Sequence, residues 1–128
     1  MSTEAAEAVS ESVVRHHLQA FLEQRGVAAI TSDYAADARF LPGTRVYRGR
    51  PEIRAFFTDF LAALPAGALD RFALTSLRVA GNVAYITWSV GTDIPLGTDT
   101  FVVEDGRLVS QTFAMYAPAA AEAGAGRG

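Results

Sequence analysis

The first half of the chain shows the apolar spacing of helices. In residues 10–24 the side chains Val14, Leu18 and Phe21 recur every three or four positions, which places them on one helical face. Ser10 is a residue type that commonly caps a helix N-terminus. The pattern therefore predicts a helix that begins near Ser10 and buries one apolar stripe.

Two further helices are expected in the same half of the chain. A short one is predicted over residues 27–35, and a longer one begins near Pro51, because the first turn of a helix accepts proline. Pro65 and Gly67 end the longer helix. Between the two helices a short hairpin is expected from the segments ARFLP and RVYRG. The predicted buried face of the longer helix consists of Ile53, Phe56, Phe57, Phe60, Leu61 and Leu64.

After Gly67 the apolar period changes to two, which is the period of strands. The dipeptides Gly81–Asn82 and Asp105–Gly106 are typical of tight hairpin turns. This order of elements predicts an α+β fold in which three N-terminal helices pack on a strongly curved antiparallel β-sheet. The concave face of such a sheet can enclose a pocket. The predicted strands are residues 72–79, 83–90, 99–103 and 107–116.

The composition is that of one globular domain. The chain has 128 residues, of which 50% are apolar and 20% charged, and its formal net charge is −3. This length suits a single core. The small charge predicts neither nucleic acid nor an anionic membrane as a partner. Because the chain has no cysteine, disulfides, thiolate metal sites and cysteine nucleophiles are excluded.

Both ends of the chain are rich in alanine together with glycine or glutamate. We expect residues 1–9 to be a flexible N-terminus, residues 10–117 to form the domain, and residues 118–128 to be a disordered Ala/Gly tail. The first residues lack the basic start and the apolar run of a secretory signal, and no apolar run is long enough for a membrane helix. A cytoplasmic protein is therefore expected.

The order of three segments resembles a known family. The segments AFLEQRGVAAITSDYAADARFLP, YRGRPEIRAFF and LGTDTFVVEDGRLVSQTF are similar to the SnoaL-like and ketosteroid-isomerase-like branch of the nuclear transport factor 2 superfamily. The similarity extends over residues 13–116. It implies a cone-shaped domain with an interior pocket. Isomerases, dehydratases, cyclases, epoxide hydrolases and non-catalytic binding or dimerisation modules all use this fold, so the resemblance alone does not define the activity.

The resemblance also implies roles for individual residues. Asp99 matches the protonated aspartate of the ketosteroid isomerases, which lies two positions before a phenylalanine. Beside it these enzymes place a tyrosine hydroxyl from the first helix, and both groups donate to the enolate oxygen. The tyrosine position falls on His17 if the turn EQRGV is one residue longer than in the family. Without that insertion it falls on Leu18.

Three other family positions give a mixed result. A second tyrosine, at the end of the short helix, matches Tyr34, whereas a third matches Phe57, which has no hydroxyl. The general-base aspartate of the isomerases precedes a proline in the first hairpin. Here Leu41 precedes Pro42, and this departure argues against the steroid isomerase reaction.

The alternation of the strand supports a role for Asp99 without the family. Asp99, Phe101 and Val103 share one face, so the carboxylate is expected to be partly desolvated, which would raise its pKa towards neutrality. A carboxyl of this kind is a candidate acid or base. The alternative is a structural aspartate bonded to a backbone amide or to the Thr98 hydroxyl.

His17 lies three residues after Val14 and four before Phe21, beside the predicted buried stripe, whereas His16 points to the opposite side. A histidine in such a place is either a structural group or a catalyst, and the spacing leaves both open. A neutral imidazole can exchange a proton near pH 7, so His17 could act as a partner of Asp99.

The last strand offers a further polar group. Gln111 alternates with Phe113 and Met115, and by the family pattern this set faces the cone, where the Gln111 amide could orient Asp99 or a ligand. On the preceding strand the sequence leaves the inward face open, and Trp88 is expected in the core or in a dimer interface. The inward set is either Tyr85, Thr87 and Ser89 or Ile86, Trp88 and Val90.

These observations lead to a first hypothesis of a cofactor-independent acid–base enzyme. It would isomerise, cyclise or eliminate from a small, largely apolar carbonyl or polyketide-like molecule, with Asp99 and His17 as the catalytic pair. No metal is expected, because the adjacent histidines project from different helix faces and no HExxH motif occurs. The expected binding residues are Tyr34, Phe40, Phe57, Phe60, Phe101, Gln111, Phe113 and Met115.

The second hypothesis is a non-catalytic module of the same fold that binds a small ligand or dimerises. The absence of an acid at Leu41 favours this second hypothesis. Under either hypothesis a homodimer is expected, because helices can cover only one face of the sheet and the other face would expose apolar side chains.

Overall fold

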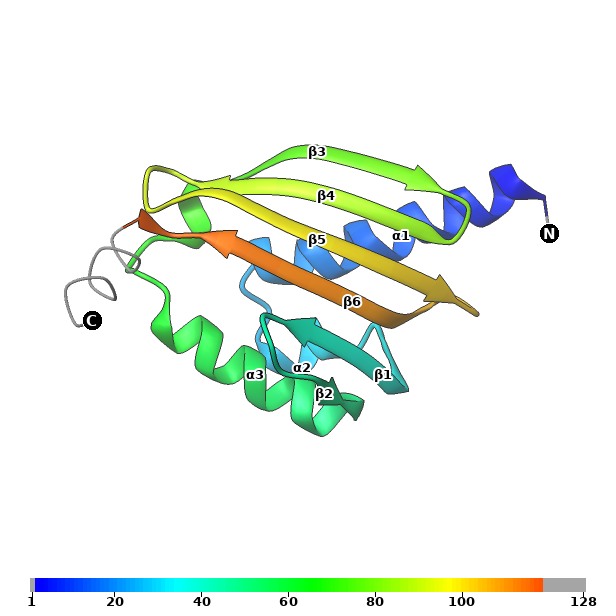
Figure 1. Ribbon diagram of the computed structural model, residues 1–128, viewed down its shortest axis with the longest axis horizontal. Coiled ribbons are helices and arrows are strands. Elements are labelled where there is room, and N and C mark those ends of the chain that lie inside the picture. The colour runs from blue at the N-terminus through cyan, green and yellow to red at the C-terminus, as the bar shows by residue number, and fades with distance from the viewer. Residues whose placement is uncertain (1, 119–128) are drawn as a thin grey trace.

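A computed structural model describes residues 2–118 and contains three α-helices, one 3₁₀ turn and six strands. Figure 1 shows the long strands β3–β6 side by side, with α1 passing behind them and α3 beside β1 and β2. In chain order the elements are α1 (Thr3–Leu22), α2 (Val27–Thr31), β1 (Tyr34–Pro42), β2 (Tyr47–Arg48), α3 (Gly49–Ala63), η1 (Leu69–Arg71), β3 (Phe72–Ala80), β4 (Val83–Val90), β5 (Ile94–Glu104) and β6 (Arg107–Tyr116).

The six strands form one sheet in the order β2-β1-β6-β5-β4-β3. All neighbours are antiparallel except β1 and β6, which run parallel. The expectation of a purely antiparallel sheet was therefore wrong. Tight turns join only antiparallel neighbours, and no turn joins β1 to β6, so no local turn signal could reveal their relative direction. The third helix also follows the β1–β2 hairpin and is not N-terminal to every strand.

The first helix begins earlier than its apolar pattern indicated. It starts at Thr3, with Ser2 as the cap, so Ser10 is an interior residue of the helix and is fully buried. Its hydroxyl donates to the Gly81 carbonyl at 3.0 Å, and the Gly81 amide donates to Glu7 at 2.9 Å. The N-terminal turns are thus bonded to the β3–β4 turn, a non-local contact that helical periodicity does not predict.

Three other element boundaries differ from the sequence expectation. The second helix ends at Thr31, so Tyr34 opens strand β1 and does not lie at the end of a helix. Its pairing partner is Leu108 of β6, another contact distant in sequence. The third helix begins at Gly49, before Pro51, and β5 extends back to Ile94. The predicted turns at 81–82 and 105–106 are present between the strands.

The burial pattern of β4 settles which of its faces points inward. Ile86, Trp88 and Val90 are buried, whereas Val83 and Tyr85 are 38% and 40% exposed. The helices therefore cover the face that carries Trp88. A cluster of phenylalanines from β1, α3 and β6 fills the space between that face and α3, with ring centroids 4.8–6.4 Å apart.

The sequence also led us to expect a disordered C-terminal tail and no membrane helix. The predicted tail, residues 118–128, lies outside the described residues except for residue 118. Within residues 2–118 no helix is both long and apolar enough to cross a membrane.

Candidate functional site

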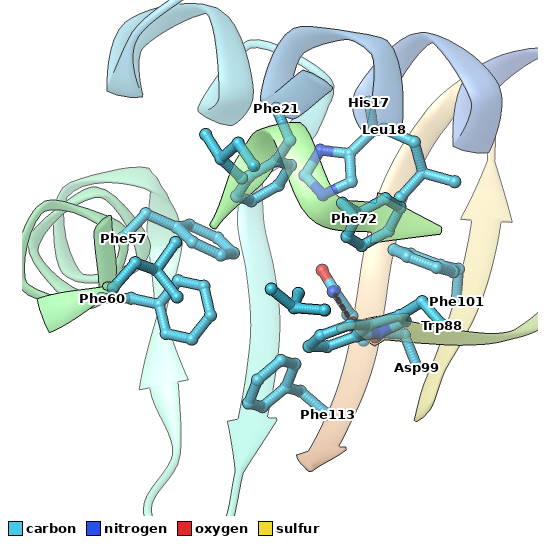
Figure 2. A pocket seen from close by; sticks show the side chains of 14 residues that line it. His17, Leu18, Phe21, Phe57, Phe60, Phe72, Trp88, Asp99, Phe101 and Phe113 are labelled. Atoms are coloured by element: carbon cyan, nitrogen blue, oxygen red, sulfur yellow. Dashed lines mark hydrogen bonds between the residues drawn. The ribbon is translucent and has the colours of Figure 1, made fainter. Parts of the chain in front are cut away.

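An interior cavity lies between α1, α3, η1 and the inward face of the sheet. Its wall is mostly aromatic, and His17, Asp99 and Gln111 are its polar side chains (Figure 2). The room that it leaves for water-sized molecules is about 60 Å³. Six phenylalanines contribute to the wall, namely Phe21, Phe57, Phe60, Phe72, Phe101 and Phe113.

Asp99 is the buried acid of this cavity. The alternation of β5 turns it inward together with Phe101, and it is 6% exposed. Two donors hold its carboxylate. The Trp88 indole Nε1–H donates to Oδ1 at 2.7 Å, and the Gln111 Nε2–H donates to Oδ2 at 2.7 Å. Such charge-assisted bonds fix the plane of the carboxylate and favour its ionised form.

Burial outweighs those two donors in setting the pKa of Asp99. Desolvation raises the pKa, while the bonds from Trp88 and Gln111 lower it, and the result is a rise from 3.8 to about 6. The group is therefore mostly ionised at pH 7 but can take up a proton within about one pH unit of neutrality. An aspartate with an ordinary pKa would be a far weaker base.

Tyr34 sets the orientation of the Gln111 amide. Its hydroxyl donates to Gln111 Oε1, and both side chains are buried. Burial raises the pKa of Tyr34 well above its usual value, so the hydroxyl keeps its proton. With Oε1 occupied by this donor, Gln111 presents its NH₂ group to Asp99. A continuous hydrogen-bonded chain thus runs from Tyr34 through Gln111 to Asp99.

Trp88 is a site residue that the sequence reasoning missed. We expected it in the core or in a dimer interface, and it is buried in the core. What the sequence did not reveal is that it also lines the cavity and bonds to Asp99. Gly97 lies opposite Trp88 in the β4–β5 pairing, and a Cβ atom there would lie 2.1 Å from the indole ring. A glycine inside a strand often marks such a close approach. Gly97, two residues before Asp99, was the available signal.

His17 lines the same cavity and is neutral. Its Nδ1 lies 3.1 Å from the Ile30 carbonyl oxygen, which only accepts, so the ring proton is on Nδ1 and Nε2 carries a lone pair. Burial lowers the pKa of His17 from 6.5 to about 4. The edges and faces of aromatic rings surround it, with Phe21 and Tyr34 at centroid distances of 5.2 and 5.3 Å. His17 is therefore a hydrogen-bond acceptor near neutral pH, not a proton donor.

His17 and Asp99 face one cavity without bonding to each other. The Asp99 partners are Trp88 and Gln111, and that of His17 is a backbone carbonyl. Leu18 also lines the cavity, so both alternatives for the family tyrosine position reach it, but only His17 brings a polar atom.

The predicted binding residues separate into three groups. Phe57, Phe60, Phe101 and Phe113 line the cavity together with Gln111. Phe40 and Tyr34 are fully buried behind that wall, where Phe40 stacks on Phe57 at 5.3 Å. Met115 shares the inward alternation of β6 but lies beyond the cavity, and it is 43% exposed.

The family's general-base position lies away from the cavity. Leu41 is 39% exposed, and its neighbour Phe40 is the residue of β1 that points inward. Among residues 2–118 no second carboxylate replaces it, since Asp99 is the single acidic residue that they contribute to the cavity wall. Among residues 2–118 no group of three or more His, Asp or Glu residues could hold a metal ion.

The architecture and the cavity define a class of protein, a small α+β domain whose curved mixed sheet and helices surround an apolar interior with one buried acid. The SnoaL-like domain model matches residues 14–111, and the chain belongs to that family. No curated protein has a sequence that matches this chain.

Solved structures agree with this assignment at the level of the fold. A nuclear transport factor 2-like protein of unknown function from Burkholderia xenovorans superposes with a TM-score of 0.72 at 20% identity, over 88% of this chain and 86% of that one. A candidate ketosteroid isomerase from Kribbella flavida superposes with a TM-score of 0.67 at 17% identity, over 86% of this chain and 79% of that one. A SnoaL-like protein of unknown function from Burkholderia thailandensis superposes with a TM-score of 0.69 at 16% identity, over 86% of this chain and 96% of that one.

Proposed function

We propose that the protein is a cofactor-independent acid–base enzyme that acts on a small, largely apolar carbonyl compound. The observation that carries the proposal is Asp99, a carboxylate in an apolar cavity whose pKa burial raises to about 6 despite two hydrogen-bond donors. A group of this kind is suited to removing a proton near neutral pH. The likeness to a candidate ketosteroid isomerase supports the same class of chemistry.

Asp99 would act as the base in the first step. One carboxylate oxygen takes the proton from the carbon next to the substrate carbonyl. The electron pair of that C–H bond forms a C=C bond to the carbonyl carbon, and the π pair of the C=O bond moves onto the oxygen to give an enolate. The Gln111 amide has a second N–H that could bond to this oxygen. His17 Nε2 would accept a hydrogen bond from a hydroxyl of the substrate. Isomerisation, cyclisation and elimination all begin with this step.

Exchange of ketone protons tests the first step directly. Cyclopentanone in D₂O should exchange the hydrogens beside its carbonyl faster with the protein than in buffer alone, and ¹H NMR follows the loss of signal. The substitution Asp99→Asn should reduce the catalysed rate by about 10²-fold or more, a typical loss for one acid–base group. Asp59→Asn, at an exposed position on α3, is the matched control and should keep the parent rate. Equal rates for the Asp99→Asn variant and the parent would refute the proposal.

A non-catalytic ligand-binding module is the second candidate. Both oxygens of Asp99 already accept hydrogen bonds, and this arrangement favours a carboxylate with a structural role. Under this alternative the parent protein binds cyclopentanone, as ¹H–¹⁵N shift changes would reveal, but does not accelerate the exchange.

A further inference from the structure

An outer groove adjoins the interior cavity. It lies between the C-terminal ends of α1 and α3 and the segment that leads into η1, and it leaves about 330 Å³ for water-sized molecules. Phe21, Leu64 and Leu69 line both spaces, so these three side chains form the partition between the groove and the cavity.

The interior cavity alone is too small for an ordinary substrate. Its 60 Å³ holds a few water molecules, whereas sites for small organic ligands usually measure about 300–1,000 Å³. The outer groove lies within that range. A substrate whose reacting end lies beside Asp99 must therefore extend past the partition, unless it is only a few atoms long.

The partition belongs to a segment whose backbone hydrogen bonds are local. In residues 64–71 these bonds join Leu64 to Leu61, Ala68 to Pro65, Asp70 to Gly67 and Arg71 to Ala68, and none of them is part of the sheet. The end of the segment is held by the Arg71–Asp93 ion pair, at 2.7 Å. Leu64 and Leu69 can therefore move aside without breaking a strand pairing.

The groove is more polar than the cavity. The Gln24 and Asp70 side chains line it, together with backbone at Gly26 and Gly67, whereas the cavity beyond the partition is walled by aromatic rings. Asp70 is the ionisable side chain of the groove, so an anionic group there would be repelled.

We infer that the substrate is an elongated, non-anionic molecule that occupies both spaces. Its carbonyl end lies in the cavity, its apolar middle passes between Phe21, Leu64 and Leu69, and its far end carries a hydroxyl or amide that bonds in the outer groove. The placement of the carbonyl end rests on the proposed function. The extension into the groove rests on the shared partition and on the two volumes.

A series of methyl ketones tests the extension. Affinities of 2-butanone, 2-hexanone, 2-octanone and 2-decanone are measured by ¹H–¹⁵N NMR titration. Each methylene buried past the partition should tighten binding about fourfold. Leu61 lines the groove but not the cavity, so Leu61→Trp should fill the groove and remove the gain for the longer ketones while leaving the affinity for 2-butanone unchanged.

Two controls keep the result interpretable. Leu41→Trp places the same ring on an exposed strand position away from both spaces and should leave the whole series unchanged. Pro65→Trp, at an exposed position of the groove wall, should reproduce the effect if the Leu61→Trp variant does not fold.

The outcomes separate this inference from the proposed function. Affinity that does not rise with chain length, or that rises equally in the Leu61→Trp variant, overturns the extension into the groove and leaves proton removal by Asp99 standing. A chain-length effect that the tryptophan removes, together with no catalysed proton exchange, supports the extension and overturns the proposed enzyme.

Discussion

Asp99 and His17 are buried ionisable residues whose charged forms the fold disfavours, with opposite consequences for stability. Burial raises the pKa of Asp99 to about 6. The ionised carboxylate therefore destabilises the folded protein above about pH 6. This cost is absent below about pH 3.8, where the carboxyl is protonated in the folded and in the unfolded state. Burial lowers the pKa of His17 from 6.5 to about 4, so its neutral form contributes stability above pH 6.5 that is lost as the pH falls towards 4.

The substitution Asp99→Asn should isolate the first of these contributions. The new amide can accept from Trp88 and donate to Gln111 if the Gln111 amide turns over and donates to the Tyr34 oxygen. The Tyr34 O–H then loses its acceptor, a cost that is the same at every pH between 4 and 7. The free energy of unfolding, relative to the parent, should rise by about 2 kcal/mol between pH 4 and pH 7. Urea unfolding at a series of pH values measures this difference.

His17→Leu is the control, because its stability relative to the parent should change with pH in the opposite direction. The variant no longer loses stability when the imidazole is protonated, so relative to the parent it should gain stability as the pH falls from 6.5 to 4.

Parallel pH profiles for the parent and the Asp99→Asn variant would mean that Asp99 titrates as it does in the unfolded chain.

Individual site residues were predictable where one pattern sufficed. Strand alternation was enough to turn Asp99 and Phe101 inward, and helical spacing was enough to place His17 beside the buried stripe. Residue spacing does not show which side chains are hydrogen-bonded to each other. The partners of Asp99 come from two different strands, and the low pKa of His17 depends on rings contributed by several elements.

Strand β5 shows how an element positions the site. Within three residues it provides Gly97, over which the Trp88 ring lies, and Asp99, to which that ring donates. The two positions face the same side because they are two residues apart. The hydrogen bond that Asp99 accepts from Trp88 therefore depends on the absence of a side chain at Gly97 of the same strand.

Gly97→Ala should disrupt this arrangement. The added Cβ would lie 2.1 Å from Trp88 Cε2, so the indole must move and its bond to Asp99 is lost. Overpacking of this kind costs about 1–3 kcal/mol. Thermal unfolding should show the loss, and the emission of the chain's single tryptophan should change. Thr98→Ala, on the outward face of the same strand, should do neither.

The elements themselves were predicted best where their signals are local. The turn dipeptides at 81–82 and 105–106 and the apolar stripe of α3 identified four hairpin strands and a helix near their observed positions, apart from the start of β5. The length of α1 and the start of β1 were not predictable in this way, because both depend on contacts with residues more than 70 positions away.

At the scale of the whole molecule, the outward face of β4, β5 and β6 has no charged residue over its central positions. Of the two sets on β4 that the sequence left open for an interface, Ile86, Trp88 and Val90 face the interior, so the outward set is that of Tyr85, Thr87 and Ser89. The outward set has an uncharged composition typical of the centre of a protein interface. It consists of Val83, Tyr85, Thr87, Ser89, Leu96, Thr98, Thr100, Val102, Ser110, Thr112, Ala114 and Tyr116.

We expect a homodimer that pairs this outward face with its copy. Sedimentation velocity at 50–100 μM should show a dimer, and Thr100→Lys, which introduces a charge at the centre of the face, should convert it to a monomer. Leu41→Lys, an exposed position on β1, should leave the dimer intact. A parent that sediments as a monomer at these concentrations would refute the expectation.

The fold class could be predicted from the sequence because each half of the chain has one dominant apolar period. The proposed activity stayed one of two hypotheses at the level of the sequence, since the evidence for it is the burial of one carboxylate in a cavity whose wall comes from seven elements. The proposed function depends on the pKa of Asp99, and Trp88 Nε1–H reports on that group directly.

The chain has one tryptophan, so its indole N–H gives a single ¹H–¹⁵N resonance that needs no further assignment. Followed from pH 4 to pH 8, this resonance should titrate with a midpoint near 6, and the titration should be absent in the Asp99→Asn variant. A resonance that does not shift between pH 5 and pH 7, or that shifts equally in the variant, would contradict the assignment of Asp99 as the acid–base group.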